Sequence, residues 1–452
     1  MQDWLWMTAA DLGRGIADGM IDPVALTETY LTAIDGHPLR DRIYARVSHD
    51  RARAEARAAA TRAASGLRRS PLDGVPVSWK DLFDTAGLGT EAGTKLMAGR
   101  VPDADAEVLQ NATAAGLVCL GKTHMSEIAF SGLGLNPMTA TPPCKNDAEA
   151  VPGGSSSGAA ASVAFGLAAA GIGSDTGGSV RIPSAWNDLV GLKTSHGLLS
   201  LKGVVPLCQT FDTVGPLCRS VEDANLLFGL LGGTKSADLG AASLAGLNVA
   251  ILDTIAMDGV RDAPLQAFEN AVALLEAQGV NVTHANFPQL AQAFDVAGNL
   301  YAGDSYGWWR DKVEAAPEKM FPQILERVRG GQHVSAADYV SGWNLLRQVR
   351  DTFTAAFAGF DAVIMPTAPI LPPNADRLLT DDAYYKTENL LALRNTRIAN
   401  LLDLTSLTLP TGTPSCGIMF NTPKHAEARL LRIGAAAEAA LRAGQDTKDT
   451  IA

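Results

Sequence analysis

The segment from Pro152 to Trp186 constrains the fold of this chain more than any other part of its sequence. It reads PGGSSSGAAASVAFGLAAAGIGSDTGGSVRIPSAW and consists largely of Gly, Ala and Ser. Its most apolar part, Ala159 to Ile172, is only 14 residues long, whereas a membrane-spanning helix needs about 20 apolar residues. We therefore expect a buried helix here, whose small side chains let other elements pack closely against it.

Helical and extended patterns alternate along the rest of the chain. Helical patterns begin at Thr8, Asp22 and His49, and extended patterns cover 72–83, 247–253 and 360–369. This alternation predicts an α/β fold with a mixed central β-sheet. The stretch 285–350 is helical and rich in aromatic residues, so we expect it to be an insertion or a cap over the site.

Composition and charge exclude several classes of protein. The net charge of −11 argues against nucleic acid as a partner, because phosphate backbones are bound by clustered Lys and Arg. The five cysteines are never spaced as CxxC, which indicates neither a disulfide framework nor a zinc site and favours a reducing, cytoplasmic location. The start of the chain has no basic region before an apolar core, so we expect no signal peptide and no membrane association.

Two short motifs suggest other functions. The string GLVCLGKT (116–123) matches the phosphate-binding loop pattern, but a helical pattern precedes Gly116 and apolar residues fill the loop. We interpret it as a helix, a turn and a strand that ends near Lys122. The string GSSSG (154–158) matches a nucleophile elbow centred on Ser156, but the residues before it form a poor strand, where an elbow needs a good one.

A third set of residues is spread over about a hundred positions. It comprises Lys80 in GVPVSWKDLF, Ser155 in PGGSSSG and Ser179 in GSDTGGSVRIPS. Taken alone, Lys80 is a solvated charge at a strand end and DTGGS is a tight turn. Together they resemble the amidase signature family, whose two serines have the same 24-residue spacing as Ser155 and Ser179. The resemblance extends through VGLKTSHG, FDTVGPLCRSVEDA and FDAVIMPTAP, and so covers most of the chain.

The resemblance implies a role for each residue of this set. Ser179 matches the nucleophile, Lys80 the general base, and Ser155 a relay held on a cis peptide bond. A lysine acts as a base only when it is neutral, and lowering its pKa from about 10.4 to near 7 takes about 4–5 kcal/mol, which burial can supply. Asp81 would oppose this change if it faced Lys80, but neighbouring strand residues point to opposite sides.

Residues next to the nucleophile complete the predicted site. The glycines before Ser179 allow a tight turn whose N–H groups, from Thr176, Gly177, Gly178 and Ser179, bind the developing oxyanion. By resemblance, the side chains of Ser156, Asp175 and Arg181 form a network that keeps this loop rigid; from the sequence alone, Asp175 and Arg181 are equally a generic ion pair.

These observations predict an amidohydrolase that works through an acyl-enzyme on Ser179. We expect a single domain over 1–452, with the core motifs in 70–230, and the family fold implies helices on both faces of the sheet. The chemistry suits small-molecule amides, aryl amides, esters and carbamates such as urethanes, and it needs no metal and no cofactor. The alternative is the glutaminase (A) subunit of a tRNA-dependent amidotransferase complex.

Substrate choice depends on regions that the resemblance does not define. We expect the pocket to involve Gly132, Leu133 and Gly134, within 132–137, together with the aromatic residues of 300–310 and the region 208–211. The alternative for each of these regions is an ordinary place in the core or on the surface. Dimers are frequent in the family, so the resemblance also implies a homodimer.

Overall fold

The computed structural model describes residues 2–232 and 235–451, with the backbone alone for residue 2 and residues 445–451. The strands are β1 (Tyr44–Val47), β2 (Pro76–Lys80), β3 (Val118–Thr123), β4 (Ala170–Asp175), β5 (Val190–Lys193), β6 (Thr213–Cys218), β7 (Asn248–Leu252), β8 (Asn281–Ala285), β9 (Ala362–Pro366), β10 (Thr405–Pro410) and β11 (Gly417–Thr422). They form one eleven-stranded sheet in the order β1-β3-β2-β4-β6-β5-β10-β11-β9-β7-β8. Parallel pairs such as β2–β4 occur beside antiparallel pairs such as β4–β6, so the predicted mixed sheet is confirmed.

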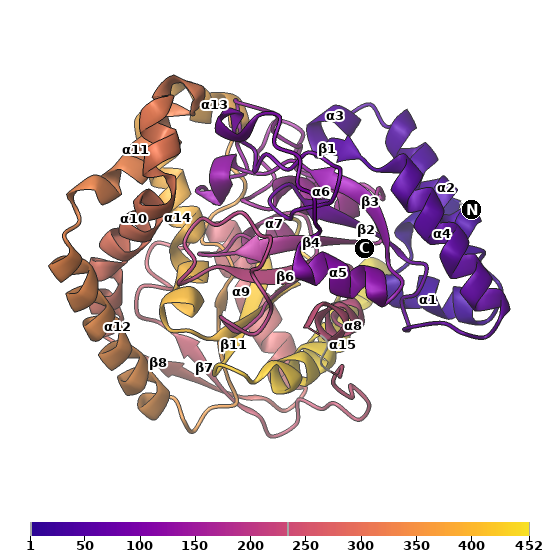
Figure 1. Cartoon of the computed structure of the whole chain (residues 1–452). Helices are drawn as coiled ribbons and strands as arrows, with labels where there is room; N and C mark the ends of the chain where they lie inside the picture. The colour runs from indigo at the N-terminus through magenta and orange to yellow at the C-terminus, as the bar shows by residue number, and fades with distance from the viewer. Residues whose placement is uncertain (1, 233–234, 452) are drawn as a thin grey trace.

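Helices account for most of the remaining chain (Figure 1). The α-helices are α1 (Ala9–Ala17), α2 (Pro23–Gly36), α3 (Arg40–Ile43), α4 (His49–Ala64), α5 (Glu107–Ala114), α6 (Ser157–Ala164), α7 (Arg181–Trp186), α8 (Val221–Gly232), α9 (Asp262–Ala277), α10 (Leu290–Ala315), α11 (Pro322–Arg329), α12 (Ala336–Ala356), α13 (Ala375–Thr380), α14 (Asp382–Leu401) and α15 (Glu427–Ile451). Short 3-10 turns are η1 (Gln2–Trp6), η2 (Lys95–Met97), η3 (Glu127–Ala129), η4 (Pro317–Lys319) and η5 (Gly330–His333). The predicted helix starts are confirmed, because Thr8 and Asp22 accept the N-cap hydrogen bonds of α1 and α2.

Helices cover both faces of the sheet. On one face, Gly191 of β5 lies against Ser184 of α7, and a Cβ at this glycine would be 2.4 Å from the Ser184 hydroxyl oxygen. Thr408 of β10 pairs with Gly191 and shares that face. Its neighbour Leu407 points to the opposite face, where it packs against Gly434 of α15. The two-sided helical cover that the family fold implies is therefore present.

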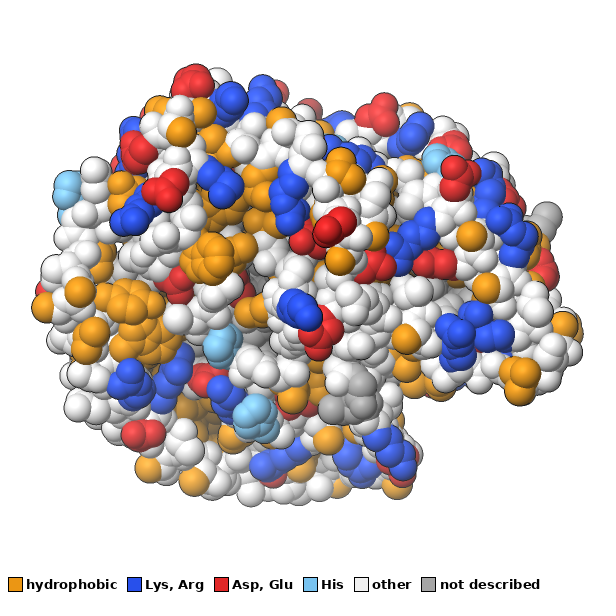
Figure 2. Space-filling view, viewed as in Figure 1, with side chains coloured by type: hydrophobic (Ala, Val, Ile, Leu, Met, Phe, Trp, Pro, Cys, Tyr) orange, Lys and Arg blue, Asp and Glu red, His pale blue; other side chains and the backbone are white. Residues whose placement is uncertain are grey.

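The two ends of the molecule are built from different helical groups. Figure 1 shows α1 to α4 at one end and α10 to α12 at the other. The helical pattern predicted for 285–350 corresponds to α10–α12, and α10 packs against both α11 and α12. Basic and acidic side chains are interspersed over the face shown in Figure 2, without an extended basic patch on that face. None of the described helices is long and apolar enough to cross a membrane.

The helix predicted from Ala159 to Ile172 is wrong in extent. Helix α6 ends at Ala164, and the chain reaches Gly166 with a φ of 71°, the left-handed region that favours glycine. The residues from Ala170 onward belong to β4 instead. A Cβ at Gly171 would lie 2.8 Å from the Ala159 carbonyl oxygen, so the small residues let α6 lie against its own following strand. Periodicity did not separate helix from strand because both are apolar and small throughout.

The phosphate-loop match at 116–123 has the local structure expected from its surroundings. Helix α5 is followed by a turn at Gly116 and then by β3. The Lys122 ammonium is buried and donates to the Phe83 carbonyl and the Thr90 hydroxyl. The interpretation as a helix, a turn and a strand is therefore confirmed.

Candidate active site

Three segments that are distant in the sequence meet at the ends of β2 and β4. Lys80 is the last residue of β2, Ser155 precedes α6, and Ser179 lies in the turn between β4 and α7. The Lys80 Nζ atom is 2.7 Å from the Ser155 hydroxyl oxygen and 2.8 Å from the Ser174 hydroxyl oxygen. The peptide bond between Gly154 and Ser155 is cis, as the family resemblance implies.

The burial of Lys80 gives it the properties expected of a base. Its side chain is inaccessible to solvent, and this burial lowers its pKa to about 7, against the opposing effect of the Asp212 and Asp175 carboxylates. Asp81 lies on the other side of the strand, where its carboxylate is 3.4 Å from Lys122 Nζ. The expectation that Asp81 faces away from Lys80 is thus confirmed.

The two expected serines are close but are not directly bonded to each other. The Ser156 N–H donates to the Ser179 carbonyl at 3.2 Å, which brings the two segments together. Among the hydrogen bonds of the described residues, none joins the hydroxyls of Ser155 and Ser179, so a relay between them requires rotation of the Ser179 side chain. The Ser156 hydroxyl instead donates to the Ser174 carbonyl. Ser156 is also fully buried, which argues against its being the nucleophile of an elbow.

Asp175 and Arg181 hold the turn that carries Ser179. Both side chains are fully buried, and an Arg181 nitrogen is 2.9 Å from an Asp175 carboxylate oxygen. Burial by itself would raise the pKa of Asp175, but the Arg181 guanidinium keeps it well below its usual range. Asp175 also accepts hydrogen bonds from the N–H groups of Gly178 and Val180. The predicted ion pair therefore binds the turn from inside.

Further hydrogen bonds fix the peptide planes of this turn. The Tyr301 hydroxyl donates to the Thr176 carbonyl at 2.9 Å, and the Thr396 hydroxyl donates to the Gly177 carbonyl at 2.8 Å. Gly178 has a φ of 137°, and a Cβ there would be 2.1 Å from the Thr396 hydroxyl oxygen, so only glycine fits. Because the Gly178 N–H already donates to Asp175, we keep the N–H groups of Thr176, Gly177 and Ser179 as oxyanion donors.

Sequence reasoning missed several residues of this site. Ser174 is the second hydroxyl in contact with Lys80. Asp212 accepts a hydrogen bond of 2.5 Å from the Thr176 hydroxyl and another from the Leu207 N–H, while burial raises its pKa to about 7. Asp212 lies in the quoted string FDTVGPLCRSVEDA, but nothing in that string indicates which residue it contacts. Among the described residues, no cluster of three or more His, Cys, Asp or Glu side chains has a metal-binding arrangement.

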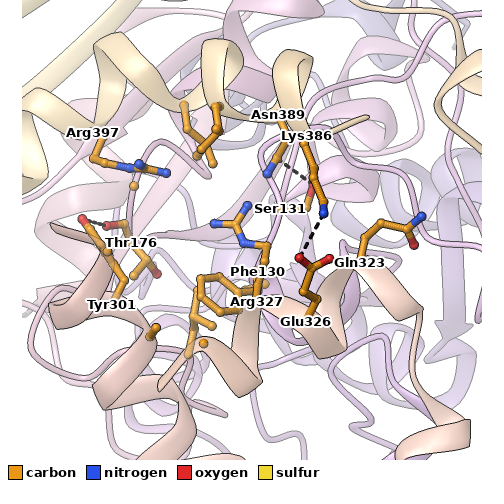
Figure 3. Close-up of a pocket in the computed structure, with 18 of the residues that line it drawn as sticks. Phe130, Ser131, Thr176, Tyr301, Gln323, Glu326, Arg327, Lys386, Asn389 and Arg397 are labelled. Carbon is orange, nitrogen blue, oxygen red and sulfur yellow. Dashed lines mark hydrogen bonds and ion pairs between the residues drawn. The ribbon is translucent and has the colours of Figure 1, made fainter. Parts of the chain in front are cut away.

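A cavity of about 360 Å³ opens beside Ser179 and is lined mainly by apolar surface (Figure 3). Its walls come from the nucleophile turn, from α10, α11 and α14, and from Ala129, Phe130 and Ser131. Of the aromatic residues expected from 300–310, Tyr301 lines it; of the region around 208–211, the preceding Leu207 does. Phe211 stacks on Tyr301 behind that wall, with 4.4 Å between ring centroids.

The expected pocket residues Gly132, Leu133 and Gly134 do not line this cavity, which is a correction. The wall is formed by the three residues before them. The Gly132 N–H donates to the Asn389 side chain. Gly134 lies against Gly153, with 2.5 Å from a Cβ at Gly134 to the Gly153 carbonyl oxygen. These glycines allow backbone segments to approach closely and leave no side chain to contact a ligand.

Comparisons with known proteins agree with this geometry. The family model described as amidase matches residues 25–431. The chain is 34% identical over 405 residues to a 2-amino-5-chloromuconic acid deaminase of Comamonas testosteroni, covering 87% of both proteins. It is 30% identical over 489 residues to the A-type subunit of the glutamyl-tRNA(Gln) amidotransferase of Thermobifida fusca (strain YX), covering 98% of this chain and 97% of that protein. A solved crystal structure of an amidase superposes with a TM-score of 0.85 at 29% identity, over 96% of this chain and 99% of the other.

Proposed function

The chain belongs to the amidase family, whose members are hydrolases acting on carbon–nitrogen bonds, and we propose that it cleaves a small-molecule carboxylic amide through an acyl-enzyme on Ser179. The same mechanism would accept aryl amides, esters and carbamates, because all of these have an sp² carbonyl and a leaving group that can be protonated. One relative is named for its action on an acid, which supports a small polar substrate.

In the proposed acylation, the neutral Lys80 amine accepts the Ser155 proton while Ser155 accepts the proton of Ser179. The Ser179 oxygen forms a bond to the substrate carbonyl carbon, and the negative charge on the carbonyl oxygen is stabilised by the N–H groups of the turn. Collapse of this intermediate breaks the C–N bond, and the proton held by Lys80 returns through Ser155 to the departing nitrogen. Water then cleaves the Ser179 ester by the same proton path and releases the acid.

The observation that carries this proposal is the position and burial of Lys80. An ammonium that keeps its charge cannot accept a proton, but burial brings the pKa of Lys80 to about 7. Its nitrogen lies 2.7 Å from the Ser155 hydroxyl oxygen, which is within the reach needed for proton transfer. Ser179 in turn borders the cavity, so a bound substrate can meet it.

The test combines a substrate panel with covalent labelling. We expect the purified chain to hydrolyse small aryl amides, and a fluorophosphonate probe to modify Ser179, as located by mass spectrometry of the digest. Ser179→Ala should abolish turnover and labelling while the melting temperature is retained. Ser184→Ala is the matched control, because this buried hydroxyl near the turn has no hydrogen-bond partner among the described residues. Labelling of any other serine, or an active Ser179→Ala enzyme, would falsify the assignment.

A second candidate function is the glutaminase component of a tRNA-dependent amidotransferase. Its support is the similarity to the Thermobifida fusca amidotransferase protein over nearly the whole of both chains. Such a component would release ammonia from glutamine and depend on partner proteins and ATP. We expect the single chain to hydrolyse simple amides without ATP, and strict dependence on glutamine and added partners would favour the second candidate.

A further inference from the structure

Two arginines face the cavity beside Ser179 without any carboxylate partner. Arg327 from α11 and Arg397 from α14 both line it, and Figure 3 shows their guanidinium groups directed into the space between those helices. Neither makes a hydrogen bond or an ion pair with another described residue. Their polar contacts are instead aromatic: Arg327 lies 4.4 Å from the Phe130 ring centroid and Arg397 lies 5.6 Å from that of Tyr301.

The remaining charged residues of the cavity do not neutralise this pair. Glu326 is the only carboxylate among the described lining residues, and it is bound to Lys386 at 2.9 Å. Arg329, two residues after Arg327, shows the usual arrangement, since it is paired with Glu314 at 2.7 Å. The cavity therefore holds two uncompensated positive charges in a chain whose net charge is −11.

Both arginines are held near the reacting loop and near each other. A Cβ at Gly177, two residues before Ser179, would be 4.0 Å from the Arg397 Nε atom. Burial lowers the pKa of Arg327 to about 10, and the positive charge of Arg397 contributes to the same lowering. Two like charges in a half-buried cavity repel each other, and an anion placed between them removes that repulsion.

We propose that this cavity binds an amide that carries a carboxylate group, and that Arg397 and Arg327 bind that carboxylate. The proposal rests on the proposed amidohydrolase function and narrows its substrate class. A guanidinium presents parallel N–H donors that match the two oxygens of a carboxylate. Because Arg397 lies beside the nucleophile turn, the carboxylate belongs within a few bonds of the amide that is cleaved. The apolar walls then contact the carbon skeleton between the two groups.

A binding experiment tests the arginines without any need for turnover. Isothermal titration calorimetry with succinate, maleate and glutarate should show binding to the wild type and to Ser179→Ala. Arg397→Met and Arg327→Met should each weaken the affinity at least about tenfold, the usual effect of losing one charged hydrogen-bonding partner. Arg329→Met, which removes a cation already paired on the same helix, should change nothing.

A kinetic experiment links the arginines to the reaction. We expect succinamic acid to be hydrolysed with a KM that Arg397→Met raises at least about tenfold, with Arg397→Lys restoring part of the loss. Succinamic acid methyl ester, which lacks the charge, should respond little to these substitutions. Circular dichroism and melting temperatures show whether each variant is folded, so a loss of binding in a folded variant is interpretable.

The outcomes separate the two proposals. If none of the dicarboxylates binds, if both methionine variants bind them as the wild type does, or if inorganic phosphate binds more tightly than all three, the carboxylate proposal is wrong. If dicarboxylates bind through the arginines but every amide is inert, the binding inference stands and the amidohydrolase proposal fails.

Discussion

The Lys80 ammonium nitrogen lies 2.7 Å from the Ser155 hydroxyl oxygen, and neither side chain is accessible to solvent. The lysine has no direct ion pair with another described residue, so nothing in contact with it offsets the loss of hydration. Its pKa of about 7 follows mainly from that burial. Two measurable consequences concern pH, one for catalysis and one for stability.

The activity should depend on the ionisation of Lys80. A protonated lysine cannot accept a proton, so we expect kcat/KM to fall below pH 7 and to rise to a plateau above it, with an inflection near the lysine pKa of about 7. Lys80→Arg should be inactive across this range, because a guanidinium stays protonated. A stopped assay with a neutral ester substrate from pH 5 to pH 10 provides the profile. A flat profile over this range would contradict the role of Lys80 as the base.

The stability of the wild type should also depend on Lys80. Its folded-state pKa is lowered from 10.5 to about 7, so between these values the unfolded chain binds more protons than the folded one. Relative to Lys80→Met, the wild type should therefore gain about 1 kcal/mol of unfolding free energy per pH unit as the pH rises from 7 to 10. Urea unfolding of both proteins at several pH values gives the difference. A difference that stays constant with pH would mean that Lys80 has an ordinary pKa when folded.

The two glycines of the nucleophile turn should respond differently to alanine. At Gly178 the φ of 137° and the 2.1 Å approach of the Thr396 hydroxyl leave no room for a Cβ. We expect Gly178→Ala to lower stability by about 1–3 kcal/mol and kcat by at least about a hundredfold. Gly177→Ala is the matched variant, since its nearest neighbour would be 3.7 Å away. Thermal melts and steady-state kinetics compare them, and equal stabilities would show that the turn adapts more easily than the contacts indicate.

The buried pair of Asp175 and Arg181 should show strong coupling. Asp175→Asn or Arg181→Met leaves one buried charge without its partner, which destabilises a protein by about 3–5 kcal/mol. The double variant removes both charges, so its loss of unfolding free energy should be clearly smaller than the two single losses together. Denaturant unfolding of the four proteins completes the cycle, and additive losses would argue against a direct pair.

The sequence predicted the chemistry of the site better than its surroundings. Lys80, Ser155 and Ser179 could be identified because their local motifs and their spacing are specific to a family. Ser174 and Asp212 could not, since their contacts depend on how β4 and the segment near β6 come together in space.

The pocket was the least predictable part of the site. Its walls come from α10, α11 and α14, which lie more than a hundred residues after the nucleophile. Arg327 and Arg397 belong to ordinary amphipathic helices, and sequence periodicity does not indicate which basic residue lacks a partner. The alternating fold and the helical character of 285–350 were predictable, whereas the boundary between α6 and β4 was hidden by a run of uniformly small residues.

Arg181 also joins the nucleophile turn to α14. Besides Asp175, it donates to the Thr396 carbonyl at 2.8 Å and to the Asn400 side chain at 2.7 Å. The serine and the helix that carries Arg397 thus have one common anchor, while Arg327 comes from the outer helical group. In directed evolution, changes in α10–α12 should therefore alter the tolerated length of a ligand readily, whereas preference for a charge next to the cleaved bond should resist selection.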